Sequence, residues 1–204
     1  RNLNAPINLV RNDPTLGNIF QVESSAFFAK NSVSIYFETK PTKKTYFSTT
    51  YKLSKSVSDT EGAFSLPSDN FNLKRDKSSS NDDSRHRIFS SFGWSPKNGI
   101  SFSASFLAVS PKPINITTGF DDNKDTIFND RPFGVQRNSL RGTWTHKFDS
   151  SFQWTFSLEK KGQISTGADG SSSMKGRTLT FRTNIENLFN TTNFDSFVGV
   201  QSSP

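Results

Sequence analysis

Three oxygen-bearing side chains at alternating positions are the clearest candidates for chemistry in this sequence. Asp121, Asn123 and Asp125 have the first, third and fifth positions of a calcium-binding loop, and Ca²⁺ prefers such carboxylate and amide oxygens. Thr126 stands where that loop has its turn glycine, and Pro132 stands where a bidentate glutamate would close the site. Two interpretations stay open: a Ca²⁺ site at these three residues, and a solvated turn rich in Asp and Asn. No other cofactor is expected.

The two histidines are the next candidates, because imidazole binds metals and titrates near neutral pH. His86 and His146 both fall on apolar strand faces near predicted strand ends. The expected strand directions put them at opposite rims of the sheet. We therefore expect that they do not share a metal and that each lies at a membrane interface.

No residue pattern indicates an enzyme. Ser, His and Asp are all present, but no G-x-S-x-G elbow or paired-carboxylate arrangement gives them a catalytic context. The chain has no cysteine, which excludes disulfides and thiolate metal sites. Its net charge of +7 is spread along the chain instead of clustered, so we expect no nucleic-acid partner.

Strands must position these side chains, because polar and apolar residues alternate one by one. In Ser139–Lys160 the aromatic residues Phe152, Trp154 and Phe156 fall on one face, and we interpret this segment as a hairpin with its turn at Asp149 and Ser150. The same alternation predicts strands at Val33–Phe37, Thr45–Leu53, Arg85–Trp94, Ile100–Ala108 and Leu179–Ile185, with another near Ile19–Val22. The polar faces of the predicted strands carry Lys52, Arg85, Arg87, Arg141 and Arg182.

The predicted connections alternate between short and long. Short turns are expected at Lys40–Lys43, Ser95–Gly99, Asp149–Ser150 and Asn187–Thr192. Long connections are expected from about Lys55 to Ser84, Ser110 to Arg137 and Lys161 to Gly176. This asymmetry is typical of an antiparallel up-and-down β-barrel in an outer membrane, with tight periplasmic turns and long outer loops.

We therefore expect the apolar faces of the predicted strands to contact lipid. A mean hydropathy of −0.61 and the lack of a long apolar run exclude a membrane helix. A strand that is wet on one face scores as polar even when its other face lies in lipid. The predicted strands have about nine to eleven residues, which is enough to cross a hydrocarbon layer at a tilt.

Strand direction sets the expected extent of the domain. With the long connections outside, Trp94, Trp144 and Trp154 all fall in the periplasmic half, where an aromatic girdle is expected. The strand after Asn193 then rises, so we expect at least one descending strand beyond Pro204. Residues 1–204 are expected to form one partial barrel domain of roughly eight or nine strands. Residues 1–17 are expected to form an irregular connection, and no plug domain is expected in this chain.

Four segments carry a family resemblance: NITTGFDDNKDTIFNDRPFGVQRNSLRG (Asn115–Gly142), YKLSKSVSDTEGAFSLPSD (Tyr51–Asp69), RHR (Arg85–Arg87) and NIENLFNTTNF (Asn184–Phe194). They resemble the C-terminal barrel of TonB-dependent receptors, most closely the Oar-like subgroup, whose members carry a carboxypeptidase-regulatory-like domain. The resemblance covers most of the chain from about Gly17 onward.

The resemblance implies a function as well as a fold. It implies a cell-surface receptor in the bacterial outer membrane, with a barrel of about 22 strands and energised uptake of a ligand through TonB. The implied partners are membrane lipid, the remaining strands, and a plug through which TonB acts. Two alternatives stay open: a soluble β-sandwich or adhesin-like binding module whose Phe-rich faces meet in a core, and a small stand-alone outer-membrane barrel. The ligand is not indicated.

Overall fold

Long antiparallel strands dominate the fold. The structure, a computed structural model, describes residues 1–204 except 63, 159–163, 167–171, 175–176 and 202–204. The long strands are β1 (Phe28–Thr42), β2 (Thr45–Ser58), β4 (His86–Lys97), β5 (Ile100–Val109), β8 (Thr145–Ser157) and β11 (Thr178–Ile185). The short elements are the 3₁₀ turn η1 (Leu73–Asp76) and the strands β3 (Ser78–Ser79), β6 (Pro113–Ile114), β7 (Leu140–Arg141), β9 (Ile164–Thr166) and β10 (Ser172–Met174).

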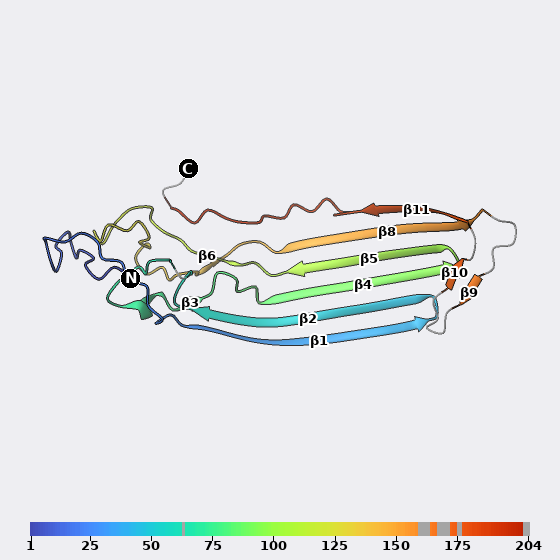
Figure 1. The fold of residues 1–204 in the computed structure, drawn as a ribbon, viewed down its shortest axis with the longest axis horizontal. Coiled ribbons are helices and arrows are strands. Elements are labelled where there is room, and N and C mark those ends of the chain that lie inside the picture. The colour runs from blue at the N-terminus through green and yellow to red at the C-terminus, as the bar shows by residue number, and fades with distance from the viewer. Residues whose placement is uncertain (63, 159–163, 167–171, 175–176, 202–204) are drawn as a thin grey trace.

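The long strands form one sheet in the order β1-β2-β4-β5-β8-β11, each antiparallel to its neighbours. They lie side by side in a single layer (Figure 1). The prediction of an all-β antiparallel fold is confirmed. Among the described residues the sheet is open and not a closed barrel, because β1 and β11 each lack a strand on their outer side.

Two tight turns define one end of the sheet, which we call the short-turn end. Lys43 and Lys44 join β1 to β2, and Asn98 and Gly99 join β4 to β5. Gly99 has a φ of 80°, the left-handed conformation that an Asn-Gly hairpin turn requires. The second turn falls within the predicted connection Ser95–Gly99, and the first overlaps the predicted connection Lys40–Lys43 but lies one residue further along the chain. Residues 59–85 and 110–144 form long connections at the opposite end, which we call the loop end.

The predicted turn at Asp149 and Ser150 is wrong, because both residues lie in the middle of the single strand β8. Asp149 is paired with Ser105, and Ser150 is paired with Ala104. The alternation of polar and apolar side chains runs through this polar pair without a break. Two adjacent polar residues therefore sit on opposite faces of one strand, and Ser139–Lys160 is not a hairpin.

Because the chain does not turn at Asp149 and Ser150, it runs after β8 in the direction opposite to the predicted one. The β8–β11 connection leaves from the short-turn end, where the β9–β10 hairpin lies (Figure 1). Part of the predicted outer loop at Lys161–Gly176 lies outside the described residues, but its placement at the loop end is wrong. The expected turn at Asn187–Thr192 is also wrong as a reversal of the chain. The Leu188 amide donates to the Phe148 carbonyl at 2.8 Å, and the Asn193 side chain reaches the His146 carbonyl at 2.7 Å, so the chain continues beside β8 toward the loop end.

The N-terminal segment is held by polar contacts instead of strand pairing. The strand predicted near Ile19–Val22 is replaced by a single bridge between Asn2 and Phe20. The buried Asn2 amide donates to the Asn70 side chain at 2.7 Å, and the Asn4 side chain donates to three backbone carbonyls. The Asn2 contact joins residues 1–22 to the long connection 59–85 at the loop end, and the Asn4 contacts hold the N-terminal segment itself together.

The sheet encloses no hydrophobic core. Among the described residues, the only buried apolar side chains are those of Ala5 and Ala108. Large apolar side chains on the sheet are widely exposed, for example Ile35 at 61% and Phe181 at 56%. No helix among the described residues is long and apolar enough to cross a membrane.

Candidate functional site

One face of the sheet is almost continuously apolar. Cross-strand rows of side chains define it, because directly paired residues point the same way. In one row Trp94 stacks on Phe102 with ring centroids 5.5 Å apart, and Phe102 contacts Phe152 at 4.9 Å. In the next rows Phe156 stacks on Phe181 at 6.1 Å. The remaining large members of this apolar face are Val33, Ile35, Phe37, Phe47, Tyr51, Leu53, Ile88, Phe92, Phe106, Phe148, Trp154, Leu179 and Ile185.

Aromatic residues with polar atoms lie at both ends of the apolar face. Trp94 and Trp154 lie at the short-turn end, as predicted, but Trp144 lies at the loop end. His86 and His146 both stack on Trp144, with centroids 6.1 and 6.2 Å away, so their predicted placement at opposite rims is wrong. The error follows from the false turn at Asp149 and Ser150, which placed the residues just before it at the short-turn end. The face therefore has Trp-containing clusters at its two ends and Phe, Ile and Leu between them.

The opposite face is polar, and hydroxyl pairs bridge its strands. Ser48 bonds Ser91 at 2.8 Å, and Ser103 bonds Ser151 at 2.7 Å. Three of the five predicted cations of the polar face belong to the sheet there: Lys52 is paired with Arg87, and Arg182 donates to Gln153 at 2.7 Å. The other two, Arg85 and Arg141, lie at the loop end and both contact Asp83.

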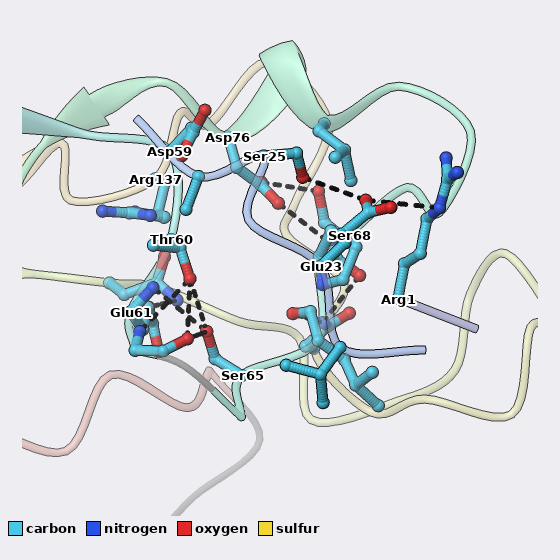
Figure 2. Close-up of a pocket in the computed structure, with 18 of the residues that line it drawn as sticks. Arg1, Glu23, Ser25, Asp59, Thr60, Glu61, Ser65, Ser68, Asp76 and Arg137 are labelled. Atoms are coloured by element: carbon cyan, nitrogen blue, oxygen red, sulfur yellow. Dashed lines mark hydrogen bonds and ion pairs between the residues drawn. The ribbon is translucent and has the colours of Figure 1, made fainter. Parts of the chain in front are cut away.

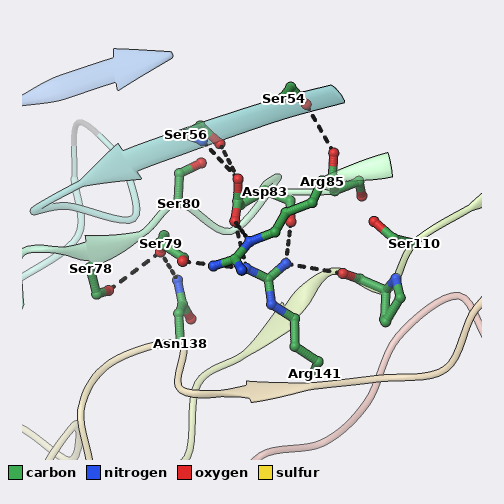
Figure 3. Close-up of polar contacts among 12 residues, drawn as sticks. Ser54, Ser56, Ser78, Ser79, Ser80, Asp83, Arg85, Ser110, Asn138 and Arg141 are labelled. Carbon is green, nitrogen blue, oxygen red and sulfur yellow. Dashed lines mark hydrogen bonds and ion pairs between the residues drawn. The ribbon is translucent and has the colours of Figure 1, made fainter. Parts of the chain in front are cut away.

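Asp83 ties the roots of the two long connections to the sheet (Figure 3). Its side chain is fully buried, and Oδ1 accepts the Ser56 amide of β2 at 2.7 Å. Oδ2 lies 2.5 Å from Nη2 of Arg141, which comes from the second long connection. Burial alone would raise the pKa of Asp83, but the hydrogen bonds and charge of Arg141 and the Ser56 amide outweigh it and lower the pKa. This carboxylate is therefore ionised and paired at neutral pH.

A second buried carboxylate links the same two connections farther from the sheet. Asp76 at the end of η1 forms an ion pair with Arg131 and accepts the amide and the hydroxyl of Ser68 at 2.8 and 2.7 Å. Burial would raise the pKa of Asp76, but the hydrogen bonds from Ser68 and Arg131 lower it below its ordinary value. Because the Asp76 and Arg131 side chains are only 5% and 9% exposed, water screens this pair little.

We call the two long connections, joined by the buried Asp76 and Asp83 contacts, the loop assembly. Acid should weaken it. The pKa values of Asp76 and Asp83 lie below that of an unfolded Asp, about 3.9, so the unfolded segments bind protons first as the pH falls. The stabilisation by both carboxylates is complete above pH ~5 and is lost as the pH falls through their folded-state pKa values. Hydrogen exchange, corrected for intrinsic rates, should show protection of residues 110–144 at pH 6 and weaker protection at pH 3, below the pKa of an unfolded Asp. Equal protection at both pH values would contradict this prediction.

The predicted calcium loop forms one compact turn. Asp121 accepts the amides of Asp125 and Thr126 through its two oxygens, both at 2.9 Å, and Asn123 accepts the Asp125 amide at 2.9 Å. Thr126, at the glycine position of such loops, has a φ of 75°. Burial raises the pKa of Asp125, with the charges of Asp130 and Asp121 adding to the effect, and a bound cation would offset this. Within the described part of the chain no three His, Cys, Asp or Glu side chains form a metal-ligand group, and Ca²⁺ binding here stays a prediction.

A cavity of about 260 Å³, lined by both polar and apolar side chains, lies between the N-terminal segment and the two long connections. Figure 2 shows Arg137, Thr60 and Glu61 on one side of it and Arg1, Glu23 and Ser68 on the other. The cavity is lined by residues from positions 1–26, 59–76 and 115–137, so all three segments must be in place for it to exist.

Sequence reasoning missed the residues that build this assembly. Asp76, Asp83, Arg131 and Arg137 stand in long connections rich in Ser, Asn and charge, for which the sequence predicts only long outer loops. Their composition is that of mobile segments, and the pairing of a charge near position 80 with one near position 140 has no periodic signature. The available signal was the Arg-rich end of the Asn115–Gly142 segment, where Arg131, Arg137 and Arg141 recur without exposed acidic neighbours.

Comparisons with protein-family models, with curated proteins and with solved structures found no match to this chain. The resemblance to TonB-dependent receptors therefore rests on the sequence segments alone, and the geometry of the sheet has to support any function independently.

Proposed function

We propose that this chain forms part of the barrel wall of a TonB-dependent receptor in the bacterial outer membrane, which takes up a ligand with energy supplied through TonB. The observation that carries the proposal is the uncovered apolar face with Trp-containing clusters at both ends. In a transmembrane barrel the outward face is an apolar band about 25 Å tall between two aromatic girdles.

The spacing of the two clusters fits that band. Trp144 and Trp154 are ten residues apart on the same strand face. At ~3.4 Å per residue they are ~34 Å apart along the strand, and a tilt of ~45° reduces this to ~24 Å across a membrane.

The single layer argues against the sandwich alternative. A β-sandwich buries its apolar residues between two sheets about 10 Å apart. Here one sheet carries the Phe-rich face, and among the described residues no second sheet lies against it. Lipid is the partner that would cover such a face without a further protein layer.

The other parts of the chain take their roles from that placement. The polar face, with its hydroxyl pairs and the cations Lys52, Arg87 and Arg182, becomes the wall of the lumen. The loop end becomes the outer surface, and the short-turn end becomes the periplasmic side. The partners are lipid, further strands at the β1 and β11 edges, and a plug domain through which TonB acts.

Membrane partition tests the proposal. The protein should require detergent for extraction from membranes and, once folded, should migrate differently on a gel before and after boiling. A β-sandwich would instead purify from the aqueous fraction as a folded monomer with no heat-dependent migration, and that result would refute the proposal.

A further inference from the structure

Two cations stand side by side on the polar face of the sheet without a partner. Lys52 of β2 and Arg87 of β4 are directly paired across the strands, so their Cβ atoms are ~5 Å apart on one face. Among the described residues, neither side chain has a hydrogen bond or an ion pair. Like charges directly opposite each other destabilise a sheet, and such local conflicts are expected at functional sites. We call Lys52 and Arg87 the cation pair.

The acidic side chains of this face have other partners. Asp149 and Glu186 lie 3.1 and 3.3 Å from Nζ of Lys147, which belongs to the next row of the polar face toward the short-turn end. Glu38 accepts the hydroxyl of Tyr36. Lys147 thus shows how a cation of this face is neutralised within the chain, and no described acidic side chain does the same for the cation pair.

Apolar side chains lie directly beside the cation pair. Val109 of β5 is paired with Arg87, and Phe89, two residues along β4, is paired with Leu107. Phe89 is 45% exposed although it lies on the polar face, and Arg87 is exposed as well. Apolar neighbours lower the local dielectric constant and so strengthen the attraction of the cation pair for an anion. They also offer a ligand an apolar surface to contact.

These two features together indicate one kind of ligand. A phosphate monoester carries a charge of about −1.5 to −2 at neutral pH, which matches two cations, whereas a carboxylate carries a single charge. A guanidinium such as that of Arg87 can donate two parallel hydrogen bonds to a phosphate, and the ammonium of Lys52 adds a point charge. A ring attached to the phosphate would reach Phe89, because two residues along a strand span ~7 Å.

We propose that the cation pair, with Phe89 and Leu107 beside it, binds an organic phosphate that has an aromatic or other apolar body. In a barrel wall this site faces the lumen, so its role as a determinant of the transported ligand rests on the proposed function. Binding of the phosphate itself is measured directly and does not rest on it.

Calorimetric titration of the full chain tests the proposal, in a phosphate-free buffer with a maltoside detergent. The probes are phenyl phosphate, which has both parts of the proposed ligand, inorganic phosphate, which lacks the ring, and benzyl alcohol, which lacks the charge. We expect phenyl phosphate to bind at least about tenfold tighter than inorganic phosphate, because contact with Phe89 removes roughly 60 Å² of apolar surface from water. Benzyl alcohol should show no saturable binding.

Three variants separate the contributions to binding. Arg87→Gln should weaken the binding of phenyl phosphate at least about tenfold, since it removes charge-assisted hydrogen bonds. Phe89→Ser should lower the affinity for phenyl phosphate to that for inorganic phosphate and leave the affinity for inorganic phosphate unchanged. Arg182→Gln is the matched control: Arg182 lies on the same face toward the short-turn end, where it donates to Gln153, and its loss should leave binding unchanged.

The melting temperature without ligand separates a binding role from a structural one. Arg87→Gln removes a like-charge contact from the sheet, so it should leave the melting temperature equal or raise it. A lower melting temperature together with weaker binding would show that Arg87 supports the sheet, and that result would overturn the assignment.

Four other results would overturn the proposal: phenyl phosphate does not bind; it binds no tighter than inorganic phosphate or benzyl alcohol; Arg87→Gln binds it like the unaltered protein; or Arg182→Gln weakens its binding as much. Membrane partition of the same samples keeps the two proposals apart. Phenyl phosphate binding by a protein that needs no detergent would refute the receptor and leave the phosphate site standing. A membrane-inserted protein that binds no probe would refute the phosphate site and leave the receptor standing.

Discussion

Ser150→Arg should prevent the protein from assembling in a membrane, whereas Ser151→Arg should be tolerated. Both serines lie in the middle of β8, near the midpoint between Trp144 and Trp154, and they differ mainly in the face they occupy. Ser150 lies between Ala104 and Ile185 on the apolar face. An arginine on the lipid face at the membrane midplane costs about 2 to 4 kcal/mol.

Ser151 is the control, because it bonds Ser103 on the polar face, where an added cation would meet water and the nearby Asp149. The fraction of heat-modifiable protein in lipid vesicles measures assembly. Equal tolerance of the two variants would show that the apolar face does not meet lipid, and equal loss would show that this part of β8 accepts no large side chain on either face. Both results contradict the assignment of faces.

Asp83→Ala should release the long connections from the sheet. The substitution leaves the Ser56 amide and the Arg141 guanidinium without their shared partner, and breaking a buried ion pair from one side costs about 3 to 5 kcal/mol. Because the Arg141 side chain is 27% exposed, water compensates it in part, and we expect the lower end of that range. The rate of proteolysis within residues 110–144 of the folded protein measures the release.

Asp82→Ala is the matched control at the neighbouring position. Asp82 pairs with Lys112 at 3.3 Å, but the two side chains are 83% and 62% exposed, so their pair is worth at most about 1 kcal/mol. Comparable cleavage of the two variants would mean that Asp83 does not anchor the connections.

The strands were predictable because their side chains meet two different surroundings on two faces. Thr45–Leu53 and Ile100–Ala108 lie within observed strands, and so does Arg85–Trp94 except for Arg85 itself. The Asn98–Gly99 turn was predictable because it requires the left-handed backbone conformation that glycine allows. Alternation reports which residues share a face, and that information is local in the chain.

The error at Asp149 and Ser150 shows what alternation does not report. Asp149 and Ser150 are a polar pair in the middle of a strand, and two adjacent polar residues look like a turn in the sequence. The phase of the alternation, however, is the same before and after them, and neither residue is a glycine or a proline. The Asp149 side chain instead accepts a hydrogen bond from the backbone amide of Asn187, in the segment that follows β11, at 2.8 Å. The one false turn misplaced Trp144 and His146, which precede it, and inverted the predicted direction of the chain that follows it.

The loop assembly could not be predicted from the sequence, for a different reason. The contact of Asp83 with Arg141 joins residues 58 positions apart, and that of Asp76 with Arg131 joins residues 55 apart. Neither partner alternates or stands at a fixed spacing from the other, and only the folded sheet brings the roots of the connections together.

The open edges of β1 and β11 raise the question of what selects the strand that pairs with each of them. A strand edge presents a row of backbone N–H and C=O groups, and those groups are the same in every polypeptide. Selectivity between the intended strand and a second copy of this chain therefore does not reside in the edge itself. It has to come from the side chains that flank the edge, because cross-strand pairs and the pattern of the two faces set the partner and the register.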